Sequence, residues 1–70
     1  MPRIIEWDMD NGEVIARIPY DSLEEAEKAL EEMIKEAEKE GWICDPAPCS
    51  LGGYICVSPE GANRHVYIED

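Results

Sequence analysis

Four residues of this sequence have side chains that could bind a metal ion or attack a substrate, and they are Cys44, Cys49, Cys56 and His65. Thiolates and imidazoles are the ligands that zinc prefers, and a cysteine beside a histidine can form an activated thiol nucleophile. Structural zinc ligands usually come in pairs roughly two to four residues apart. Here four, six and eight residues separate the successive candidates, which is unlike a zinc site. We therefore expect no metal, no cofactor and no enzymatic activity.

The three cysteines are expected to stay reduced, as in most cytoplasmic proteins. If a disulfide formed, Cys44 and Cys56 would be the easiest pair to bridge, because we expect them on adjacent strands. His65 is expected on the outer face of the sheet, with Cys56 as its nearest thiol and no pocket around it. A metal or redox protein that uses these four residues is therefore the least favoured alternative.

The composition describes a small and strongly acidic domain. The chain has 70 residues, with 17 Asp and Glu against 6 Lys and Arg, so its formal net charge is -11. This length predicts a single domain over residues 1–70 with a thin core. No apolar run approaches the ~20 residues of a membrane span, and no signal peptide is recognisable, so we expect a cytoplasmic location. The acidity opposes direct binding to nucleic acid or to an anionic membrane and predicts a basic partner.

The pattern of elements predicts an α+β fold of the order β-β-α-β-β-β. In this fold an antiparallel sheet of about five strands carries one amphipathic helix on one face. Residues 3–9 alternate in polarity, and Asn11-Gly12 is typical of a two-residue hairpin turn after them. Counting outward from that turn pairs Ile5 with Ile18 and places Ile5 on the side of the helix.

The helix is the clearest element of the sequence. Ser22 and Glu25 form a capping box at its start, and Gly41 is placed to end it. Nine acids and three lysines between residues 21 and 40 place six of the eleven net negative charges on this element. Apolar residues recur at three- and four-residue spacing and predict the stripe that faces the sheet: Leu23, Ala26, Leu30, Met33, Ile34 and Ala37.

The rest of the chain is predicted to add three strands, over residues 42–44, 54–58 and 65–69. Ile55 and Val57 are expected to share the helix-facing side with Val66 and Ile68. Several apolar residues would then point away from the helix, and these are Ile4, Ile15, Tyr54, Cys56 and Tyr67. No second helix remains to cover this outer face. An uncovered apolar patch favours association, so one alternative is a homodimeric interaction module that uses Ile4, Ile15, Tyr54 and Tyr67.

The favoured hypothesis is a small non-enzymatic inhibitor that occupies the basic surface of a nucleic-acid-handling protein. The acids of the helix would imitate phosphates, and the candidate contacts are Glu24, Glu27, Glu31 and Glu38. Such mimicry requires neither a pocket nor a cofactor. The negative field of the whole chain would steer it toward basic surfaces.

From its opening strand, through Asp-x-Asp-Asn-Gly and a second strand, to a helix with Glu-Glu-Ala, the chain resembles the fold of HicB-type antitoxins. The glycine-rich stretch of that family before the helix is absent, and Pro19-Tyr20-Asp21-Ser22 stands in its place. Small acidic phage proteins that block bacterial immunity complexes are similar in size and charge. Both resemblances imply a protein that binds and blocks a partner, and neither assigns a site residue.

Overall fold

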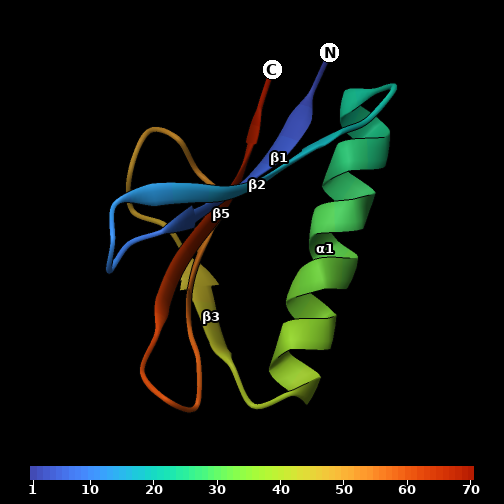
Figure 1. The fold of residues 1–70 in the computed structure, drawn as a ribbon. Coiled ribbons are helices and arrows are strands. Elements are labelled where there is room, and N and C mark those ends of the chain that lie inside the picture. Colours follow the sequence, from blue (N-terminus) through green and yellow to red (C-terminus); the bar gives the residue numbers. More distant parts are fainter.

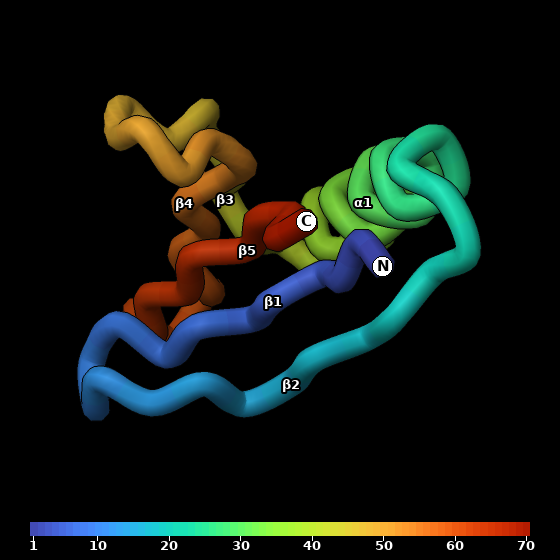
Figure 2. Tube along the Cα trace, turned by 90° about the horizontal axis from the view of Figure 1, so that it is seen from above, coloured from blue at the N-terminus to red at the C-terminus, as the bar shows by residue number.

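The computed structural model describes all 70 residues and shows the predicted α+β fold. Its elements are β1 (Arg3–Asp8), β2 (Glu13–Pro19), α1 (Leu23–Lys39), β3 (Ile43–Pro46), β4 (Tyr54–Val57) and β5 (Asn63–Glu69). All strand pairs are antiparallel and form one sheet in the order β2-β1-β5-β4-β3. The helix α1 lies on one face of this sheet (Figure 1). Figure 2 shows β2 and β3 at the two edges and the chain termini close together.

Both ends of α1 are capped by the residues that the sequence predicts. The Ser22 hydroxyl accepts a hydrogen bond of 3.2 Å from the backbone N–H of Glu25. At the other end Gly41 adopts a φ of 95°. The N–H groups of Gly41 and Trp42 then donate to carbonyls of the last turn at 3.1 and 3.0 Å, as in a Schellman motif. The positive φ and the two returning bonds explain why a glycine ends this helix.

The core lies between α1 and the sheet. Its buried cluster consists of Ile4, Leu30, Ile34, Cys56 and Val66. The predicted stripe of α1 faces this cluster, with one exception. Leu23, the first residue of the helix, is 46% exposed and does not join the core.

The first hairpin does not form the predicted two-residue turn. A type I′ turn needs a positive φ at both central residues, but only glycines adopt a positive φ in this chain, so Asn11 does not. Instead Asp8 pairs with Glu13, and the side chain of Asp8 holds the loop between them. Its carboxylate accepts from the Asn11 amide at 2.7 Å and from the N–H of Asp10 at 3.0 Å. The hydrogen bond from the Asn11 side chain lowers the pKa of Asp8 below its ordinary value.

The longer turn changes the register of the hairpin, so the predicted faces of β1 are wrong. Ile4 pairs with Ile18 and Ile5 with Arg17, and the register shifts between Glu6 and Trp7, where Ile15 of β2 is the unpaired residue of a bulge. A one-residue slip turns every side chain of a strand to the other face. Ile4 therefore lies beneath α1 with 0% of its surface exposed, and it is not on the outer face.

In the second hairpin, β5 has the predicted parity, with Val66 and Ile68 on the side of α1, but β4 has the opposite one, so Ile55 and Val57 face away from α1. Tyr54 pairs with Val66, and Ile55 pairs with His65. Tyr54 and Cys56 therefore face α1, where they pack in and around the core. Of the predicted outer patch, only Tyr67 lies on the face away from α1, because its neighbour Val66 points into the core.

The outer face is covered in part by the loop of residues 47–53, which connects β3 to β4. Figure 1 shows this loop on the side of the sheet opposite α1. The carbonyl of Gly52 lies 2.8 Å from Nε2 of His65, and Leu51 borders a hollow with Trp7 and Tyr67. The loop thus occupies part of the surface that the sequence predicted to be uncovered. The homodimer remains a prediction, but the continuous apolar outer face from which it was inferred is not present.

Candidate functional site

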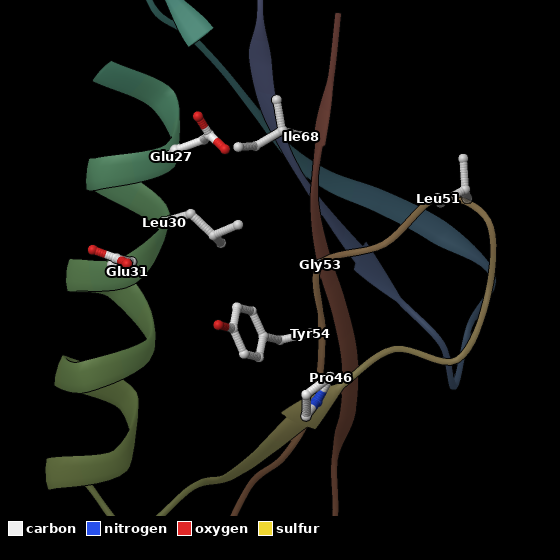
Figure 3. A pocket seen from close by; sticks show the side chains of 8 residues that line it. All are labelled: Glu27, Leu30, Glu31, Pro46, Leu51, Gly53, Tyr54 and Ile68. Carbon is white, nitrogen blue, oxygen red and sulfur yellow. The ribbon is translucent and has the colours of Figure 1, made fainter. Parts of the chain in front are cut away.

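A groove of about 350 Å³ lies along one flank of α1, where the helix faces the β3–β4 side of the sheet (Figure 3). Leu30 and Tyr54 point toward one another across it, and Glu27 reaches from the helix toward Ile68 (Figure 3). Its apolar lining includes Leu30, Tyr54 and Ile68, while Glu27 and Glu31 contribute carboxylates. The groove therefore combines apolar surface with negative charge.

A second hollow of about 270 Å³ continues the groove along the same flank of α1. Glu31 and Tyr54 line both hollows, and Glu38 adds a third carboxylate. Lys35 is the one basic residue of the two linings. We call the two hollows together the acidic groove. It is lined by Glu27, Leu30, Glu31, Ile34, Lys35, Glu38, Cys44, Pro46, Leu51, Gly53, Tyr54 and Ile68.

The structure separates the predicted contact residues into different places. Glu27, Glu31, Glu38 and Tyr54 meet in the acidic groove. Glu24 is exposed on α1, two turns before Glu31, and lies outside the lining. Ile4 is buried in the core, Ile15 lies at the β2 bulge and Tyr67 is on the outer face. The acids and Tyr54, which were predicted for two different faces, therefore belong to one surface.

The opposite flank of α1 has a different character. A cleft of about 210 Å³ there is lined mainly by apolar side chains, among them Ile15, Met33 and Trp42. Its two charged residues, Glu6 and Arg64, have opposite signs. The guanidinium of Arg64 lies 5.9 Å from the centre of the Trp42 ring, within the range of a cation–π contact. Of the two flanks of α1 that border the sheet, only the groove side is thus lined by an excess of acidic side chains.

Cys49 is the thiol that lies close to His65, because the loop of residues 47–53 brings it over the outer face. Its Sγ is 3.9 Å from Nε2 of His65. The prediction that Cys56 is the thiol nearest to His65 is wrong, because Cys56 faces α1 on the other side of the sheet. His65 is 7% exposed, and its ring lies 4.7 Å from that of Tyr67.

The hydrogen bonds of His65 oppose a catalytic pair with Cys49. Nε2 lies 2.8 Å from the Gly52 carbonyl, which can only accept, so Nε2 carries the proton in the neutral ring. The lone pair that could accept the thiol proton is then on Nδ1, whereas Cys49 lies at Nε2. This arrangement fastens the loop to the sheet and does not activate the thiol.

The other two cysteines face each other on the helix side of the sheet. Cys44 of β3 and Cys56 of β4 are direct partners in the antiparallel register. Cys44 is half-buried, and Cys56 is only 3% exposed. Burial, followed by the hydrogen bond with the Cys44 thiol, raises the pKa of Cys56 to about 12. The sheet lies between this pair and Cys49 with His65, and no three His, Cys, Asp or Glu residues are grouped to hold a metal ion.

These environments predict different rates of thiol alkylation. Cys49 is exposed and should react first with iodoacetamide at pH 8, whereas Cys56 should react last. With a pKa of about 12, only ~0.01% of the Cys56 thiol is ionised at that pH, and the thiolate is the nucleophile. Timed quenching with peptide mass spectrometry measures the order. Modification of Cys56 in the folded chain at the rate of Cys49 would contradict its burial.

No family model, curated protein or solved structure matches this chain. The likeness to HicB-type antitoxins therefore remains a resemblance of element order. The single helix of the fold is neither long enough nor apolar enough to cross a membrane.

Proposed function

We propose that this chain is a small acidic inhibitor that occupies the basic surface of a nucleic-acid-handling protein through the acidic groove. The observation that carries the proposal is the meeting of Glu27, Glu31 and Glu38 with Tyr54 along one flank of α1. The opposite flank is apolar and carries charges of both signs, so the asymmetry gives the helix one side suited to a basic partner. The proposal places the chain in the cytoplasm, with its partner.

The chemistry of the groove suits an arginine or lysine side chain of the partner. The alkyl stem of such a side chain would rest on Leu30, Tyr54 and Ile68, and its cationic head would reach Glu27 or Glu31. Arginine has the additional advantage that its planar guanidinium can bind a carboxylate in a bidentate manner and stack on a tyrosine ring. An apolar wall beside a carboxylate distinguishes this site from the merely solvated acids elsewhere on the helix.

The spacing of the acids supports the imitation of phosphates. Four residues advance an α-helix by about 6 Å along its axis, which separates Glu27 from Glu31. Phosphates of one DNA strand are spaced by about 3.4 Å along the duplex axis, so the two carboxylates approximate every second phosphate. A surface that binds a nucleic-acid backbone could therefore accept this flank of α1.

The net charge of -11 adds a long-range contribution to the encounter. A field of this sign attracts basic surfaces and raises the rate of association, and dissolved salt screens it. The same field repels nucleic acids and anionic membranes. Free duplex DNA should therefore not bind the chain.

The test compares two charge reversals on the same helix. Glu27→Lys, Glu31→Lys and Glu38→Lys together change the groove, and Glu25→Lys, Glu32→Lys and Glu36→Lys make the same change of charge on exposed positions outside the groove. The probe is a fluorescent nona-arginine peptide, whose Kd is measured by anisotropy at several salt concentrations. We expect the groove variant to raise Kd about tenfold more than the control variant, because local pairing is lost only there.

Each outcome of this comparison has a definite meaning. Circular dichroism should show the same helix content in all three chains, because every changed side chain is exposed. Equal weakening in the two variants would show that only the overall charge attracts the peptide and would overturn the groove as the site. Binding that ignores both salt and the groove reversal would overturn the proposed function as a whole.

A further inference from the structure

Cys44 and Cys56 are placed so that a disulfide could join them without movement of the strands. They are direct partners between β3 and β4. Cα atoms of directly paired residues in an antiparallel sheet are about 4.5–5.5 Å apart, and this range lies within the roughly 4.4–6.8 Å that a disulfide requires. Both side chains are on the helix side of the sheet. Both are reduced in this structure.

Cys44 is the more accessible of the two cysteines. Cys44 lines the hollow of about 270 Å³ between α1 and β3, together with Glu31, Lys35 and Glu38. Cys56 does not line this hollow; it borders the apolar cleft on the opposite flank of α1 and is only 3% exposed. A small molecule would therefore meet Cys44 first, with Cys56 directly behind it.

We propose that Cys44 and Cys56 form a site of reversible thiol–disulfide exchange, and that the site prefers cationic low-molecular-weight disulfides. This inference does not depend on the proposed binding of a basic protein. The juxtaposition that carries it is a directly paired dithiol, one member of which opens into a hollow rimmed by two carboxylates.

The exchange proceeds in two steps. First, the Cys44 thiolate attacks one sulfur of the small disulfide; that S–S bond breaks, and one small thiolate leaves and takes a proton from water. The product is a mixed disulfide on Cys44. Next, Cys56 loses its proton to solvent and attacks the sulfur of Cys44, and the second small thiolate leaves. The two protein thiols are oxidised, and the small disulfide is reduced to two thiols.

The charges around Cys44 explain the preference for a cation. Glu31 and Glu38 line the approach, and Lys35 offsets only one of them. The whole chain adds its negative field to this local excess. Cystamine, a dication, should therefore be enriched at the hollow, whereas glutathione disulfide, a net anion, should be excluded from it.

The pairing is tested by mass spectrometry of the intact chain after incubation with cystamine. Cys49→Ser should still lose the mass of two hydrogen atoms, because the proposed pair is intact. Cys44→Ser should stop at mixed disulfides, and the half-exposed position of Cys44 on an edge strand makes this change compatible with folding. An internal disulfide in Cys44→Ser, or none in Cys49→Ser, would overturn the proposal.

The preference is tested by the rate of internal disulfide formation in the Cys49→Ser background. At low salt we expect cystamine to react about tenfold faster than glutathione disulfide, with the ratio falling toward that of a free model thiol in ~1 M salt. Adding Glu31→Gln and Glu38→Gln should reduce the ratio, whereas Glu32→Gln and Glu36→Gln, which lie outside the hollow, should reduce it less. Equal ratios in these two variants would overturn the role of the hollow. Binding of the basic peptide is measured separately, so either proposal can fail alone.

Discussion

Gly53→Ala is expected to destabilise the chain severely. Gly53 has a φ of 74°, and a Cβ at this position would lie 2.1 Å from the carbonyl oxygen of Val66 and 2.7 Å from the Cα of Tyr67. Both atoms belong to the backbone of β5, so they cannot move aside by a change of side-chain rotamer. A left-handed non-glycine residue costs about 1–2 kcal/mol, and overpacking adds about 1–3 kcal/mol. Their sum of ~2–5 kcal/mol is a large part of the stability of so small a domain.

Gly52→Ala provides the control for this prediction, because it separates backbone strain from the clash. Gly52 has a φ of 70°, but a Cβ there would meet nothing within 4 Å. Its replacement should therefore cost only the conformational part, about 1–2 kcal/mol. Urea unfolding followed by tryptophan fluorescence gives both free energies of unfolding. Similar losses in the two variants would contradict the close approach of Gly53 to β5.

The helix could be predicted in detail because its signals are local. A capping serine, a repeating apolar stripe and a terminal glycine act within a few residues of one another. Ser22 and Gly41 therefore cap α1 as the sequence indicates. The acids on α1 are exposed for the same reason, because helical periodicity alone places them away from the stripe.

The register of the first hairpin could not be predicted because distant residues help to determine its turn. Asp10 accepts hydrogen bonds from the backbone N–H and the side-chain amide of Asn63, at 2.9 and 3.0 Å. These bonds lower the pKa of Asp10, and they attach the turn to the start of β5. Asn11-Gly12 by itself favours a two-residue turn, and nothing in the neighbouring sequence shows that Asn63 will compete with it.

Of the residues that line the acidic groove, only those on α1 could be predicted from the sequence. Glu27, Glu31 and Glu38 follow from the helical pattern, whereas Tyr54 reaches the groove because of the parity of β4. The contact between Cys49 and His65 likewise depends on how an irregular loop folds over the sheet. One signal was available, since consecutive glycines after a loop can mark a close approach of two backbones. Gly53 makes such an approach.

Ile4→Ala should lose about 2–5 kcal/mol of stability, the range for removing most of a fully buried isoleucine side chain. Ile4 is 0% exposed and packs in the cluster that contains Leu30 and Ile34 of α1. The predicted hairpin register instead put Ile4 on the outer face, where the same change would be nearly neutral. The free energy of unfolding therefore distinguishes the two registers directly.

Ile15→Ala is the matched control, because the sequence placed Ile15 on the same outer face as Ile4. Ile15 lies at the bulge and is 48% exposed, so its truncation should cost less than about 1 kcal/mol. The difference between the two variants depends on burial alone, since both remove the same atoms from the same residue type on neighbouring strands. A loss for Ile15→Ala as large as that for Ile4→Ala would contradict the bulge, and small losses in both would support the register with the two-residue turn.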